Sequence, residues 1–533
     1  LCLQSKKYIY IVSKFKYSHM KPNISSIKNL IAILAITMLF SCNKQSDYLQ
    51  SIPADANIVI TINPQSIAEK GNVIELLKNK KINERQRIWL NRLGPESKEL
   101  FEKILQNPTE LGISLKNDVV FFSDAIENEI GLLLKIDEQQ KFETFLSILS
   151  SEKGKDTNIK RENDIFISEI NTNAICTFDD NKALFLFALQ YNTEIAKLKK
   201  DATALMNQNK EKSLLSNNGF SKFSQSNKDV NIWMSMAAIP STTLKLYSSF
   251  LPTDLKISSI YSTTHIDFQR GKIIIESGSY SDDTKTKKAL DNLISIVGKN
   301  SDSFLKQIPE NSWLVWSVNL NGEKLYNILM ENSKFAAEIE NVSKEINLQQ
   351  LIGSIDGDLT MGLIDITSSN SYGYSPNLVF FAKVKDDSIL TFLKDNLQLA
   401  GITTLSENQY LISWSGTSIY FGMKDNKYLY VSTDKNIIDN FSKGTESPLS
   451  QTPFAEIFKF GGAMLINTQQ ILQSLPEELW KSSDATTYKQ LLALFSSIEM
   501  YSEGQTNKTT INMTDPSDNA LSTIIKSLDK ELK

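Results

Sequence analysis

Alternating hydrophobic and polar positions predict a strand near the start of the chain. Ile58, Ile60 and Ile62 recur at every second position between more polar neighbours, which is the pattern of a strand with one buried face. Asn63 followed by Pro64 is typical of a helix start, because Asn caps the first turn and Pro is well tolerated there. We therefore expect a strand over 57–63, a buried face formed by these isoleucines, and a helix directly after it.

The same pattern returns later in the chain. Leu314, Trp316 and Val318 alternate over 313–319, and both stretches follow an Ile-Pro pair, at 52–53 and at 308–309. Further segments match in the same order in both parts: 118–121 with 358–361, 131–136 with 378–384, 164–168 with 409–413, 180–186 with 425–431, 231–236 with 463–467 and 289–294 with 520–525. An ordered series of this kind predicts a tandem duplication, with 298–302 as the linker.

Strands, helices and hairpins mix within each copy. The Asp-Asn pairs at 180–181 and 425–426 each stand between two apolar runs, as in a hairpin turn. This mixture predicts an α+β fold, a tandem duplication of a mixed, mainly antiparallel sheet-and-helix domain. We divide the chain into 1–41, an upstream extension and signal peptide, 42–300, a tether and first repeat, and 301–533, a second repeat.

The segment from Met20 to Cys42 predicts export and lipid attachment. It has a charged start, an apolar run over 30–40, and a Leu39-Phe40-Ser41-Cys42 ending that is similar to a bacterial lipobox. The apolar run is shorter than the roughly 20 residues that cross a bilayer as a helix. We expect Cys42 to be lipidated and to anchor the chain in a membrane; a cytoplasmic protein with a misleading N-terminus is the alternative.

Charge argues against a nucleic-acid partner. Of the 57 basic residues, six lie in 1–41, which contains no Asp or Glu, so the remaining chain has 51 basic and 61 acidic residues. Nucleic-acid-binding proteins normally have a basic balance. Hydrophobic residues make up 41% of the chain, which is enough for ordinary folded cores.

Few residues are available for the common catalytic or metal sites. Beyond the signal segment and Cys42, the chain has one cysteine, Cys176, and one histidine, His265. Both lie in strand-like stretches, so we expect a buried, inert thiol and a strand histidine. One Cys and one His cannot form a His/Cys zinc site, and we predict no metal and no cofactor.

Several motifs together resemble a known family. The motifs are the lipobox, Tyr48-Leu49-x-x-Ile52-Pro53-x-x-Ala56, the strand that ends at Asn63, and Leu111-Gly112-Ile113. In these the chain resembles a Bacteroidetes lipoprotein family known as domain of unknown function 4836. The resemblance implies an envelope location and brings no catalytic residues. Only Asp47 is acidic just after Cys42, which favours an outer-membrane anchor that faces the periplasm and leaves surface exposure open.

Three further motifs are candidates for function. The loop 371–377 has no counterpart of equal length in the first copy, and Tyr372 and Tyr374 are candidate binding residues at a cleft between the copies. Asp356-Gly357-Asp358 is interpreted as a turn rather than a metal site. Trp313 and Trp316 are interpreted as core residues rather than a sugar platform.

These observations favour a lipid-anchored envelope protein that binds or scaffolds an envelope partner or ligand and is not an enzyme. The alternative is an envelope hydrolase that uses two carboxylates and needs neither His nor metal. Its signature would be two close carboxyls in one cleft, one with a raised pKa.

Overall fold

The computed structural model describes most of the chain after the signal segment. The described residues are 47–73, 90–91, 93–124, 128–151, 159–189, 194–239, 242, 255–301, 304–333, 335–337, 347–369, 373–397, 401–414 and 417–531.

The described strands form one 20-stranded sheet in which each pairing is antiparallel. The strands of the first half follow one another in space as β4 (Lys160–Glu162), β5 (Ile165–Asn171), β6 (Ala174–Phe178), β7 (Lys182–Ala188), β3 (Glu129–Lys135), β2 (Val119–Asp124), β1 (Ile58–Ile62), β8 (Val230–Ser235), β9 (Ile260–Gln269) and β10 (Lys272–Ser281). Those of the second half follow from the far edge as β14 (Ile402–Ser406), β15 (Gln409–Trp414), β16 (Thr417–Lys424), β17 (Tyr428–Ser432), β13 (Gly373–Val384), β12 (Ile355–Ser369), β11 (Leu314–Asn321), β18 (Gly462–Ile466), β19 (Phe495–Glu503) and β20 (Thr506–Met513).

The two halves therefore have the same strand order, and they meet edge to edge. β10 pairs with β20 from Lys272 opposite Asn512 to Gly278 opposite Thr506, which makes the sheet continuous. The predicted α+β fold with mainly antiparallel pairing is confirmed. The domain boundaries at 300 and 301 stay a prediction, because one sheet runs through both halves.

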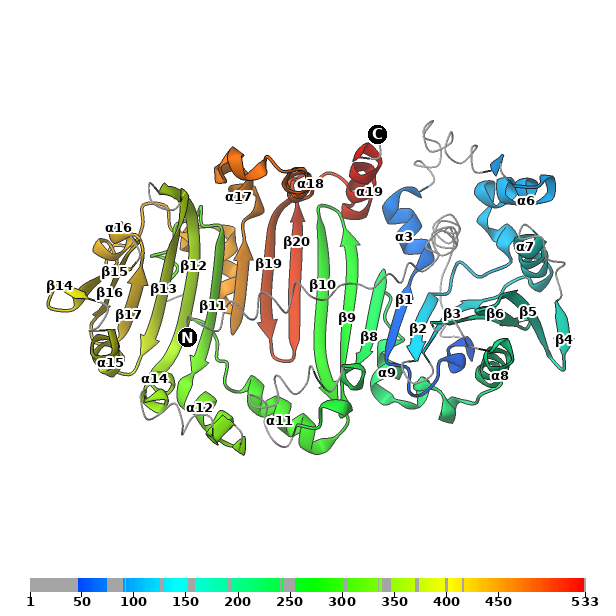
Figure 1. Ribbon diagram of the computed structural model, residues 1–533, viewed down its shortest axis with the longest axis horizontal. Coiled ribbons are helices and arrows are strands. Elements are labelled where there is room, and N and C mark those ends of the chain that lie inside the picture. The colour runs from blue at the N-terminus through cyan, green and yellow to red at the C-terminus, as the bar shows by residue number, and fades with distance from the viewer. Residues whose placement is uncertain are drawn as a thin grey trace.

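Helices lie at the ends of the central strands. Figure 1 shows α17, α18, α19 and α3 along one end and α14, α12 and α11 along the other. The helices are α3 (Pro64–Gly71), α6 (Pro95–Gln106), α7 (Gln139–Ser151), α8 (Ile195–Met206), α9 (Asn218–Phe223), α11 (Thr284–Ile294), α12 (Gly322–Met330), α14 (Leu348–Gly353), α15 (Ser388–Leu397), α16 (Lys435–Asp439), α17 (Thr468–Ser474), α18 (Ser483–Leu492) and α19 (Ala520–Glu531).

The structure agrees with the predicted helix start at Asn63 and the predicted turn at Asp425-Asn426, which both depend on interactions between residues close in sequence. The Asn63 side chain accepts a hydrogen bond from the Ser66 amide at 2.9 Å, and Pro64 opens α3. Asp425 and Asn426 adopt φ of 54° and 47° between β16 and β17. Asn and Asp tolerate this left-handed conformation, so the hairpin predicted there is confirmed.

The predicted buried face of the first strand is wrong in both halves. In β1, Val59 and Thr61 are buried at 0% and 4% exposure, whereas Ile58, Ile60 and Ile62 are half-buried. In β11, Val315 is buried and Trp316 is 36% exposed. Val59 packs with Tyr48, Ile52 and Leu133, and Val315 packs with the equivalent cluster of the second half. In both strands, elements from distant parts of the chain therefore cover the face opposite to the one that the alternation predicted to be buried.

A second correction concerns the acidic stretch at 356–358. These residues lie within β12 at a register shift, and Gly357 has φ of 138°. Asp358 is 1% exposed and accepts hydrogen bonds from the Ser301 amide at 2.9 Å and from the Asn319 side chain at 2.6 Å. The predicted turn is instead a strand irregularity whose carboxylate fixes the segment that joins the halves.

Candidate functional site

A pocket of about 860 Å³ lies where the halves meet. From the first half, α11 lines it with Leu290, Leu293 and Ile294. From the second half, β11 lines it with Trp316 and Val318. Ligand pockets usually have volumes of about 300–1,000 Å³, are largely apolar, and occur at junctions between domains. This pocket has that size, lining and position.

The segment that joins the halves forms one wall of the pocket. The Gly298 amide donates to the Asn319 carbonyl at 3.0 Å, and the Asn300 amide donates to the Phe460 carbonyl at 3.3 Å. A Cβ atom added to Gly461 would lie 2.6 Å from the Gly298 carbonyl oxygen. Since real Cβ contacts are not that short, Gly461 permits the close approach that holds this wall against the sheet.

Gly462, the next residue, leaves space instead. It pairs with Val318, just as Val230 of β8 pairs with Ile62 of β1 in the first half. A Cβ atom at Gly462 would meet nothing closer than 3.9 Å. The second half thus has a hydrogen atom where the first half has an isopropyl group, and the missing volume belongs to the pocket.

Trp316 is the residue that sequence reasoning misplaced. Its 36% exposed side chain lines the pocket, and it pairs with Met361 of β12, which is 48% exposed. Leu378 of β13 is 46% exposed and pairs with Leu363, on the same face of the sheet. An apolar strip therefore continues from the pocket along the sheet surface. The sequence feature that could have indicated this pocket is the pair of adjacent glycines at 461–462, which lies next to the strand that carries Trp316.

Charged groups are few at the pocket. Lys299 comes from the joining segment, Lys459 from the 3-10 helix η10 (Pro453–Lys459), and Glu503 from the end of β19. Lys459 also pairs with Glu456 at 2.6 Å, and both side chains of that pair are more than half exposed. Water screens such a pair strongly, so it holds Lys459 only weakly.

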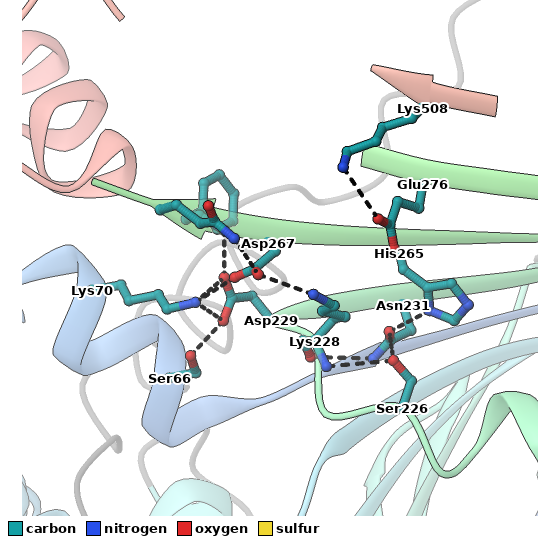
Figure 2. Close-up of polar contacts among 12 residues, drawn as sticks. Ser66, Lys70, Ser226, Lys228, Asp229, Asn231, His265, Asp267, Glu276 and Lys508 are labelled. Atoms are coloured by element: carbon teal, nitrogen blue, oxygen red, sulfur yellow. Dashed lines mark hydrogen bonds and ion pairs between the residues drawn. The ribbon is translucent and has the colours of Figure 1, made fainter. Parts of the chain in front are cut away.

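A second polar cluster connects elements of the first half (Figure 2). Lys70 of α3 is 2.8 Å from Asp229 Oδ2 and 2.6 Å from Asp267 Oδ1. Asp229 is 1% exposed and also accepts hydrogen bonds from Ser66 Oγ and, at 2.6 Å, from the Phe268 amide. Lys228 reaches Asp267 Oδ2 at 3.1 Å. The cluster ties α3 to β8 and β9.

Two lysines neutralise the two carboxylates of this cluster, and this affects whether the carboxylates could act as in the alternative hydrolase function. Burial alone would lower the pKa of Lys70, but hydrogen bonds and charges from Asp229 and Asp267 outweigh burial and raise it. Burial would raise the pKa of Asp267, but hydrogen bonds from Lys70, Gln269 and Lys228 hold it well below its usual range. A carboxyl that serves as a general acid needs a raised pKa, and the pKa of Asp267 is shifted in the opposite direction.

His265 and Cys176 lie away from the pocket lining. His265 Nδ1 is 2.7 Å from Asn231 Oδ1, and burial lowers the pKa of its imidazole. Cys176 is fully buried in β6, and burial raises the pKa of its thiol well above the usual range. The predicted burial of the Cys176 thiol and the strand position of His265 are confirmed.

The predicted binding and anchor residues lie elsewhere or outside the described part. Tyr374 is half-buried in β13, which β12, β11, β18 and β19 separate from β20, and it does not line the pocket. Tyr372 and Cys42 lie outside the described residues. A binding role for the two tyrosines and lipidation of Cys42 stay predictions.

Two features are absent from the described residues. No group of three or more His, Cys, Asp or Glu side chains among them could hold a metal ion. No helix in the same part of the chain is long and apolar enough to span a membrane.

These features define a class: an α+β protein in which two halves of equal strand order share one antiparallel sheet and leave an apolar pocket at their junction. The chain belongs to the family described as Domain of unknown function (DUF4836), whose model matches residues 48–521. No curated protein matches the chain.

Among solved structures, one described as crystal form I of TP0453 is similar to this chain at 12% identity. The match covers 47% of this chain and 85% of that chain, with a TM-score of 0.25. A likeness of that size carries no weight for function.

Proposed function

We propose that this chain is a lipid-anchored envelope protein that binds an apolar or amphipathic molecule in the pocket between its halves. The observation that carries the binding function is the open pocket of about 860 Å³ with Trp316 exposed on its wall. Water does not solvate such apolar surface favourably, so a ligand that covers it gains binding free energy.

The anchor rests on the sequence. Cys42 follows the lipobox and directly precedes the polar tether, so a lipid on its sulfur holds the folded part beside a membrane. The resemblance to Bacteroidetes lipoproteins favours an envelope location, and the lack of an acidic run after Cys42 favours an outer-membrane anchor with the folded part facing the periplasm. Replacement of Cys42 by Ser should move the chain to the soluble fraction or leave the precursor unprocessed. Unchanged membrane retention would contradict the anchor.

Binding is tested separately with N-phenyl-1-naphthylamine, an uncharged apolar dye that fluoresces in apolar sites. The purified full chain should increase its fluorescence in a saturable manner. Gly462→Val should reduce the signal at least several-fold, because two methyl groups then fill the pocket beside Val318. Gly353→Ala is the matched control, since a Cβ atom there meets nothing within 4 Å and Gly353 does not line the pocket. Equal signals from wild type and Gly462→Val would contradict a ligand in this pocket.

A further inference from the structure

We infer that the ligand of the junction pocket is an amphiphile with one alkyl chain and an anionic head, and that Lys299 and Lys459 bind the head. This inference rests on the proposed function and adds the chemical class of the ligand. It follows from the uneven distribution of charge and apolar surface around the pocket.

The cations lie together at one end. The hydrogen bond from the Asn300 amide to the Phe460 carbonyl joins the segment that carries Lys299 to the segment that carries Lys459. Both lysines line the pocket, and Lys299 is exposed. Glu503, at the end of β19, lies at the same end, because its neighbour Ser502 pairs with Gly462. The two lysines outnumber it there, so this end has a net positive charge. Two ammonium groups beside an apolar cavity attract one anionic group and favour it over an uncharged one.

Apolar surface continues away from that end. Along β11, Asn319 contacts Gly298 of the joining segment, and Val318 and Trp316 follow in the direction away from it. Trp316 then leads to its strand partner Met361. A linear alkyl chain with its head at Lys299 would therefore lie over Val318 and Trp316 and extend toward Met361.

The positive end of the pocket contrasts with the net negative charge of residues 42–533. Residues 42–533 carry 51 basic and 61 acidic groups, so their overall charge repels anions. Lys459 already has a partner in Glu456, but that pair is mostly solvated and can be exchanged for a ligand head at small cost. Lys299 supplies the second positive charge.

The experiment is displacement of N-phenyl-1-naphthylamine by three compounds with the same twelve-carbon chain: laurate, dodecyl phosphate and dodecanol. We expect laurate or dodecyl phosphate to displace the dye from the full chain at concentrations at least tenfold lower than dodecanol. A preference between the two anions distinguishes a carboxylate ligand from a phosphate ligand.

The lysines are tested by Lys299→Gln with Lys459→Gln. This double variant should lose the tenfold advantage of the anions while its response to dodecanol is unchanged. Lys443→Gln, an exposed lysine that does not line the pocket, should behave as wild type. Equal displacement by all three compounds, or an advantage that survives in the double variant, would overturn the inference and leave the proposed function intact. Absence of dye binding in wild type would instead overturn the proposed function.

Discussion

The closing helices α19 and α11 occupy equivalent places in the two halves but contact their surroundings differently. α19 lies against α3, where a Cβ atom on Gly71 would be 3.1 Å from Ile525 Cδ1. Its first residue, Ala520, is fully buried in a cluster with Ile273 and Met513. α11 has a hydrogen bond across the junction, from Gln505 to Asp291 at 2.8 Å, and leaves the pocket beside it.

Residues at equivalent strand positions explain the difference. By strand register, Asp229 and Val230 of the first half correspond to Gly461 and Gly462 of the second. Asp229 is the buried centre of the Lys70 cluster, which closes the first site, whereas two glycines provide no side chain to close the second. Duplicated folds can thus fill one site with a buried ionic cluster and leave the equivalent site open.

The largest expected effect comes from breaking the closed site. Lys70→Met leaves Asp229, at 1% exposure, without its cation and should lower the free energy of unfolding by about 3–5 kcal/mol. Urea denaturation measures this loss. Lys103→Met removes an exposed pair with Glu99 and should leave the denaturation midpoint unchanged. A midpoint for Lys70→Met equal to that of the control would mean that the cluster does not stabilise the packing of α3 on β8 and β9.

A second test compares Asp118 with Asp358, its equivalent by strand register. Asp358 accepts hydrogen bonds from the joining segment, whereas burial raises the pKa of Asp118 to about 6, opposed only by a hydrogen bond from Thr61. A carboxyl with a raised pKa in the folded state contributes stability below its unfolded pKa near 4, and this contribution is lost as the pH rises through about 6.

Asp118→Asn should therefore unfold with a higher free energy than wild type above pH 7, by roughly 2–3 kcal/mol, and show little difference at pH 4. Urea denaturation of both proteins across pH 4–8 gives the difference directly. A difference that does not change with pH would show that Asp118 ionises normally in the folded protein.

The two glycines of the open site make a matched pair. Gly461→Ala brings a methyl group against the Gly298 carbonyl and should cost about 1–3 kcal/mol. Gly462→Ala has 3.9 Å of clearance and should cost much less. Thermal denaturation of both variants checks the order. The reverse order would mean that the joining segment does not form the pocket wall.

The smallest effect on stability is expected at Trp316. Because its side chain is 36% exposed, Trp316→Ala should change the free energy of unfolding by less than about 1 kcal/mol while it weakens dye binding. Trp313→Ala is the contrast, since Trp313 is 3% exposed and donates to Ser474, and should cost about 3–5 kcal/mol. Similar losses for both would place Trp316 in the core.

The sequence alone determined what depends on neighbouring residues or on the repeat. Alternation predicted strands over 57–63 and 313–319, where the structure has β1 and β11. Asn63 and Pro64 predicted the start of α3, and the Asp425-Asn426 pair predicted a hairpin. The cap of α3 and the turn at 425–426 depend on residues only a few positions apart, so the local sequence suffices to predict them.

Only the tertiary structure decided which face of each strand is covered and where a cavity remains. Alternation states which residues share a face, but both faces of β1 and β11 carry apolar residues, and the covering elements come from distant parts of the chain. The pocket depends on α11, the joining segment and four strands of the other half, which meet only after β10 pairs with β20. Packing between such distant segments leaves no periodic signal in the sequence, so the alternation within β11 could not place Trp316 at the pocket.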